Sequence, residues 1–200
     1  ERLSLFCTCA RSALVEPILQ EIGRHTPGME GGQMSCVARQ VSTGSVIHLT
    51  AEPGTRVIGA WAYPLVGGVP DPTSVVALGK QVTDDTLGWS APEGDWFVAL
   101  VFARLNLFDP LHPDSGQLAI DGLYAPFGRE CPGEVGRTLN LFFQDELDFG
   151  CRMPFWSGFL LELFLETQGY DLTPLLPALW HDLGPITEKV RLDYADTVLR

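Results

Sequence analysis

The feature that most restricts how this chain can fold is a series of short apolar runs, each bounded by turn-forming residues, between residues 41 and 105. The runs span residues 45–50, 56–63, 74–78 and 96–103, and they are rich in the β-branched and aromatic side chains that favour strands. Turn signals separate them at Pro53-Gly54, Gly67-Gly68, Pro70-Asp71-Pro72 and Pro92-Glu93-Gly94-Asp95. Short strands at this spacing predict a small antiparallel sheet or sandwich.

The segments on either side have a different pattern. In residues 1–40, the apolar residues 14–15 and 17–19 are interpreted as a strand that leads to Glu21 and a Gly-rich loop at 23–32. From residue 106 the pattern alternates, with a strand at 137–143 and helices at 114–124, 154–168, 173–180 and 186–199. The helix at 154–168 is expected to bury one face made of Trp156, Phe159, Leu163 and Phe164.

Alternation of this kind is typical of parallel strands covered by helices. We therefore predict an α/β chain that forms a partial (β/α) TIM-type barrel interrupted by an antiparallel β insertion. The barrel elements would lie in residues 1–40 and 106–200, and the β-rich insertion in residues 41–105.

The charge of the chain argues against one class of partner. Its 200 residues carry a net charge of −12, and only Lys80 and Lys189 are lysines. Nucleic-acid binding depends on clustered Lys and Arg, so we expect no nucleic-acid partner. An acidic surface suits a neutral or cationic ligand such as a sugar, although it serves solubility equally well. No run of about 18 apolar residues occurs, so we expect a soluble chain without a membrane span.

The sharpest local feature is the segment 139–147, with the sequence LNLFFQDEL. A fully apolar strand ends there in two adjacent carboxylates, Asp145 and Glu146. A glycosidase needs one protonated and one ionised carboxyl group, and apolar walls such as Phe142 and Phe143 favour the protonated form. The alternative is that one of the acids caps a helix at a strand–helix junction.

Three further segments supply candidate site residues. Glu21 is the natural second carboxylate, because it follows an apolar run and precedes a Gly-rich loop, although a solvated acid would look the same. Asn106, Asp109 and His112 share a Pro-stiffened loop and could bind substrate hydroxyl groups, although turn-forming roles fit Asn106 and Asp109 equally well. Trp156 could stack on a pyranose ring, with burial in the core as the alternative. The cysteines and histidines lack zinc-ligand spacing.

With these residues in hand, the chain resembles glycoside hydrolase family 106, the α-L-rhamnosidase-like enzymes. The resemblance is carried by residues 142–146 (FFQDE), 153–156 (MPFW), 169–172 (GYDL), 175–180 (LLPALW), 190–194 (VRLDY) and the loop 28–32 (GMEGG). His25, Thr26 and Pro27 stand where the family loop has Trp, Pro and Ser.

The resemblance implies a barrel with a β insertion, inverting hydrolysis of terminal α-L-rhamnosyl residues from a carbohydrate substrate, and often a bound calcium. Carried over by position, Glu146 is the first choice for a catalytic carboxylate, and Asp145 is its neighbour or a metal ligand. Glu21 is the partner carboxylate.

Two other functions are compatible with these residues. Because a complete barrel takes about 250 residues, we expect the chain to be a piece of a longer protein, and it could be an inactive carbohydrate-binding or structural fragment. A barrel glycosidase acting on a β-galactoside would show the same paired carboxylates.

Overall fold

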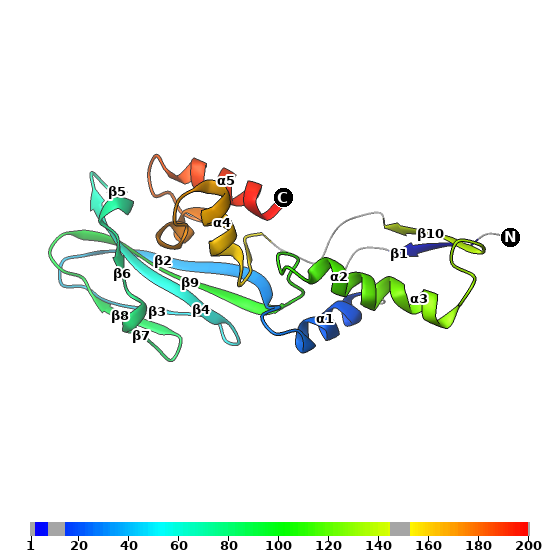
Figure 1. The fold of residues 1–200 in the computed structure, drawn as a ribbon. Helices are drawn as coiled ribbons and strands as arrows, with labels where there is room; N and C mark the ends of the chain where they lie inside the picture. Colours follow the sequence, from blue (N-terminus) through cyan, green and yellow to red (C-terminus); the bar gives the residue numbers. More distant parts are fainter. Residues whose placement is uncertain (1–2, 8–14, 145–152, 200) are drawn as a thin grey trace. The chain divides into compact units, whose positions relative to one another are not determined.

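The computed structural model describes residues 3–7, 15–144 and 153–199 (Figure 1). The chain divides into two compact units. Unit 1 comprises residues 1–32 and 106–158, and unit 2 comprises residues 33–105 and 159–200. Each is described by itself.

Unit 1 contains a small helical core. Its helices are α1 (Glu16–His25), α2 (Ser115–Ala119), the π-helix η3 (Ile120–Tyr124) and α3 (Ala125–Glu130). Pro17 lies in the first turn of α1, where its missing N–H costs no hydrogen bond. Val15, Leu19 and Ile22 follow at helical spacing and pack in a cluster with Met29 and Phe108.

Unit 1 also contains a parallel strand pair, β1 (Leu3–Cys7) and β10 (Leu139–Gln144). Leu3 pairs with Leu139 and Cys7 with Gln144, so the two strands end together. The short strand β11 (Phe155–Trp156) belongs to the same unit, and both of its residues are buried.

Unit 2 is built on antiparallel strands. They are β2 (Gly31–Ser42), β3 (Val46–Thr50), β4 (Arg56–Val66), β5 (Val69–Pro70), β6 (Val76–Ala77), β7 (Val82–Thr83), β8 (Thr86–Ser90) and β9 (Asp95–Leu107). Two 3-10 turns, η1 (Pro72–Ser74) and η2 (Gly79–Gln81), lie between them. The main sheet contains β2-β9-β4-β5 in that order with β6 also paired to β4, and a second sheet has the order β3-β8-β7.

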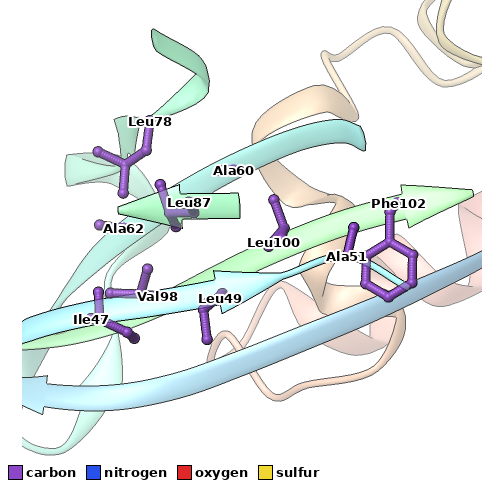
Figure 2. Close-up of a cluster of buried hydrophobic side chains, with 10 residues drawn as sticks. All are labelled: Ile47, Leu49, Ala51, Ala60, Ala62, Leu78, Leu87, Val98, Leu100 and Phe102. Atoms are coloured by element: carbon purple, nitrogen blue, oxygen red, sulfur yellow. The ribbon is translucent and has the colours of Figure 1, made fainter. Parts of the chain in front are cut away.

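One apolar cluster joins these two sheets (Figure 2). It takes alternate residues from the strands, including Ala60 and Ala62 of β4 and Val98 and Leu100 of β9. Alternate residues of a strand point to the same face, so this cluster covers one face of the main sheet.

Helices follow on the other side of β4 and β9. They are α4 (Leu160–Gln168), the 3-10 helix η4 (Thr173–Leu179) and α5 (Thr187–Leu199). The Tyr63 hydroxyl of β4 donates to the carbonyl of Pro174 at 2.8 Å, which ties η4 to the sheet. Gly169, at φ 78°, ends α4 in the left-handed conformation that glycine adopts without strain.

The predicted β-rich middle segment is confirmed, because β3, β4, β6 and β9 lie within or across the four predicted runs. The predicted α/β fold class, a partial TIM-type barrel, is wrong, because the sheets are mostly antiparallel. Residues 159–199 form three successive helices without intervening strands. These helices bury Phe164, Leu176 and Val190, so their apolar faces find partners without a parallel sheet.

Two local predictions also need correction. Of the segment 14–19, predicted as a strand, Val15 is the N-cap of α1 and residues 16–19 form its first turn; residue 14 lies outside the described residues. The helix predicted at 154–168 begins only at Leu160, and Trp156 lies in β11. Trp156 and Phe164 are buried, but they belong to different elements and form no common helix face. The spacing of apolar residues over a few positions does not distinguish a short strand from the first turn of a helix.

Candidate functional site

The carboxyl ends of β1 and β10 define the first candidate site in unit 1. The two strands are parallel and in register to their last residues, Cys7 and Gln144. Asp145 and Glu146 follow Gln144 directly in the sequence and lie outside the described residues. The structure therefore describes the strand that leads to the two carboxylates. It confirms that this strand is part of a parallel pair.

Glu21 lies within α1 and not at the end of a strand. Its carboxylate is exposed and contacts two side chains of the next helical turn, Nη1 of Arg24 at 3.4 Å and Nε2 of His25 at 2.8 Å. Exposed pairs of this spacing contribute a few tenths of a kcal/mol to a helix. The strand-end geometry expected for Glu21 is wrong, and its catalytic role stays a prediction.

Asp109 is the centre of a buried polar network in unit 1. Its side chain is 0% exposed, and Oδ2 accepts a hydrogen bond from the Ser157 hydroxyl at 2.7 Å. Oδ1 accepts from the backbone N–H of Leu111 at 3.0 Å. Burial raises the pKa of Asp109, whereas the two hydrogen bonds and the nearby His112 act in the opposite direction. The network fixes the loop after β9 against the residue that follows β11.

His112 is also buried and sits one turn after Asp109, whose carbonyl accepts from the His112 N–H at 3.2 Å. The backbone N–H of Asp114 donates to Nδ1 at 3.1 Å. Because Nδ1 accepts, the proton belongs on Nε2, which donates to the carbonyl of Pro27 at 3.4 Å. Both ring nitrogens therefore contact the backbone.

Asp109, His112 and Ser157 are the residue types of a nucleophilic triad, but their geometry differs from one. A triad requires the serine hydroxyl to donate to the histidine, so that the imidazole can take its proton. Here the hydroxyl donates to the carboxylate, and Ser157 is 0% exposed. The network is therefore structural in this arrangement. Substrate contacts of Asp109 and His112 remain predictions that require this loop to open.

The remaining predicted ligand contacts are Asn106 and Trp156. Asn106 lies near the end of β9, and its side chain is outside what the structure describes. Trp156 is only 8% exposed, which favours the core alternative over a stacking platform. Its Nε1 has no hydrogen-bond partner among the described residues.

The described residues provide no metal centre. Within residues 3–7, 15–144 and 153–199, no three His, Cys, Asp or Glu side chains are grouped to hold an ion. A bound calcium therefore stays a prediction, because Asp145, its predicted ligand, lies outside these residues. In the same part of the chain, no helix has the length and apolar character needed to cross a membrane.

Sequence reasoning missed Ser157. It lies in a segment predicted as helix, and its partner Asp109 is 48 residues away in the chain, so no local pattern marks it. Compared with known proteins, the chain matches no protein-family model, and no curated protein is significantly similar to it.

Proposed function

We propose that the chain is a glycoside hydrolase that removes terminal α-L-rhamnosyl residues from glycans with inversion. Glu146 acts as the principal catalytic carboxylate, and Asp145 acts beside it. The observation that supports this most directly is the parallel pairing of β10 with β1, whose last residues lie in register. Side chains that follow parallel strands gather at one edge of the sheet, where α/β proteins commonly bind their ligands.

The chemistry requires two carboxyl groups in different protonation states. One donates a proton to the glycosidic oxygen as the bond to the anomeric carbon breaks. The other accepts a proton from a water molecule that attacks the opposite face of the sugar. Inversion needs a separation of about 6.5–9.5 Å between the two groups, which leaves room for that water. Calcium has no step in this proposal.

The decisive variant is Glu146→Gln, assayed for hydrolysis of an aryl α-L-rhamnoside. Glutamine has nearly the same shape but can neither donate an acidic proton nor act as a base, so the rate should fall about 10²-fold or more. Glu166→Gln is the matched control, because Glu166 is exposed on α4. Far-ultraviolet circular dichroism establishes that both variants are folded.

Three outcomes would contradict parts of the proposal. A Glu146→Gln chain that keeps more than about a tenth of its turnover removes Glu146 from the reaction, since general acid–base catalysis contributes about 10²-fold or more. α-L-Rhamnose as the first product, detected by proton NMR before mutarotation, excludes inversion. An unmodified chain that binds sugars but hydrolyses none would establish the non-enzymatic alternative.

A further inference from the structure

Unit 2 contains a half-open pocket of about 280 Å³. Its walls come from Gln40 of β2, the hairpin residues 68–70, Phe97 of β9, and the neighbouring residues His181 and Asp182 after η4. All of these residues belong to one compact unit. The volume lies just below the range for small-molecule sites, about 300–1,000 Å³, and suits a ligand of a single ring.

Asp182 presents a carboxylate that the protein holds by one oxygen. Oδ1 accepts from the N–H of Gly184 at 2.8 Å and from the hydroxyl of Thr187 at 3.1 Å. Thr187 is itself fixed, because its Oγ1 accepts from the N–H of Leu183 at 2.8 Å. Among the described residues, none donates a hydrogen bond to Oδ2. The carboxylate is thus oriented in advance and keeps one oxygen for a ligand.

His181 supplies a neutral polar group beside this carboxylate. Burial, and secondarily the charge of Arg191, lower the pKa of His181, so its imidazole is uncharged at neutral pH. Nε2 is shielded from solvent and has no hydrogen-bond partner among the described residues. The ring packs against Phe97 at an angle of 63°, with centroids 5.3 Å apart.

The hairpin side of the pocket is apolar and closely packed. A Cβ added to Gly184, which has φ 85°, would lie 3.2 Å from Cγ1 of Val69 and 3.9 Å from the carbonyl oxygen of Pro70. The loop that carries Asp182 therefore packs closely on the β4–β5 hairpin. Val69 remains 45% exposed and offers an apolar surface at the pocket. The exposed amide of Gln40 adds both a donor and an acceptor.

We infer that this pocket binds one neutral sugar ring, with Asp182 and Gln40 bonded to its hydroxyl groups and Val69 against its C–H face. A bare metal ion needs several oxygen ligands, and Asp182 is the one carboxylate among the described residues that line the pocket. An anion is disfavoured by Asp182, and a purely apolar ligand would leave the polar groups without partners. The inference rests on the proposed function for its choice of ligand class.

The test follows the imidazole protons of the chain by NMR during titration with L-rhamnose. The His181 resonance is the one that disappears in His181→Gln among the signals of four histidines. We expect it to shift with millimolar affinity. Asp182→Asn replaces the ligand oxygen with a donor but keeps the Oδ1 acceptor, and it should weaken binding at least tenfold. Gln40→Ala, at an exposed position, should weaken binding in the same direction.

Asp171→Asn is the matched control. Asp171 is exposed, and its Oδ1 accepts from the N–H of Thr173 at 2.8 Å, in a turn like that of Asp182. This variant should bind L-rhamnose as the unmodified chain does. The inference is overturned if the His181 signal does not move, or if Asp182→Asn and Gln40→Ala bind L-rhamnose as tightly as the unmodified chain. It is also overturned if n-butylamine, a cation at neutral pH, moves the signal at lower concentration than the sugar, because the pocket would then prefer a cation.

The outcomes separate this inference from the proposed function. The Glu146→Gln chain should lose hydrolysis and still shift the His181 resonance. If the chain hydrolyses the aryl α-L-rhamnoside but L-rhamnose does not shift the His181 signal, only the pocket inference is overturned. If L-rhamnose shifts the signal in a way that depends on Asp182 but the chain hydrolyses nothing, only the hydrolase proposal is overturned.

Discussion

The buried Asp109–Ser157 hydrogen bond leads to a quantitative prediction for Ser157→Ala. Both side chains are 0% exposed, so the lost hydroxyl leaves Oδ2 of a buried carboxylate without this donor. A hydrogen bond to a charged group contributes about 1.5–3 kcal/mol, and we expect the free energy of unfolding to fall by that amount at pH 7. The only other hydrogen bond described for the carboxylate comes from the Leu111 N–H.

The effect should depend on pH in a defined direction. Burial raises the pKa of Asp109 above its unfolded-state value of about 3.9, so ionisation destabilises the folded state as pH rises through the folded pKa. The Ser157 hydroxyl favours the ionised form and limits this loss, and nearby His112 acts in the same direction. The cost of Ser157→Ala should therefore be full above the folded pKa. Below the unfolded pKa it should shrink to that of a neutral hydrogen bond, about 0.5–1.5 kcal/mol.

Urea unfolding followed by circular dichroism, at pH 7 and in steps down to about pH 3, below the unfolded-state pKa of an Asp, measures both quantities. Ser115→Ala is the matched control, because the hydroxyl of Ser115, the first residue of α2, donates to the neutral carbonyl of Pro110 in the Asp109 loop at 2.9 Å. Its cost should be about 0.5–1.5 kcal/mol at every pH. Equal, pH-independent losses in the two variants would refute an ionised Asp109 at the centre of the network.

Two further predictions concern packing. Gly31→Ala should destabilise the chain by about 1–3 kcal/mol, because the added Cβ would overlap the Phe155 ring and lie 3.0 Å from Cα of Asp109. Thermal unfolding measures the loss, and an unchanged midpoint would contradict this contact. Phe164→Ala should lower the free energy of unfolding by about 3–5 kcal/mol, since its ring is fully buried. Leu165→Ala should cost much less, because this side chain is 53% exposed. Similar losses for the two variants in urea unfolding would show that α4 buries a different face.

The strands of the middle segment could be predicted because glycine and proline fix their ends locally. Gly54, Gly67 and Gly68 all have φ between 61° and 84°, a conformation that other residues adopt only with strain. The chain must turn where these residues stand, whatever its tertiary contacts. Strand boundaries therefore depend on a few neighbouring residues that can be read in the sequence.

The first helix differs from the predicted strand because the apolar residues 14–15 and 17–19, on either side of Glu16, fit both periods. The distinguishing signal was Glu16-Pro17 in the first turn, with Val15, Leu19 and Ile22 at helical spacing. With this correction, Glu21 lies at an exposed position of a helix and not at the expected end of a strand. The predicted position of a candidate site residue is thus only as reliable as the secondary structure predicted for the segment that carries it.

The Asp109 network could not be predicted, because burial and partners are set by tertiary structure. The same loop of Asn, Asp and His was compatible with ligand contacts, and only the approach of Ser157 decides how the Asp109 oxygens are used. By contrast, the strand before Asp145 can be predicted from its mainly apolar sequence, in which Leu139, Leu141, Phe142 and Phe143 outnumber the polar residues. Its partner β1 comes from the other end of the chain and has no local signature.

Continuous apolar strands do not identify a barrel, and β4 and β9 show why. Trp61 and Tyr63 are as buried as Ala60 and Ala62, so both faces of β4 are covered, a pattern usually associated with parallel sheets between helices. Here the strand is antiparallel to β9, with a second sheet packed on one face and η4 tied to Tyr63 on the other. Both faces of β4 are buried because other elements pack on each side of it, and the direction of the neighbouring strand plays no part in this burial. The hydrolase proposal must therefore rest on the carboxylates that follow β10 and their chemistry, because the fold does not select a function.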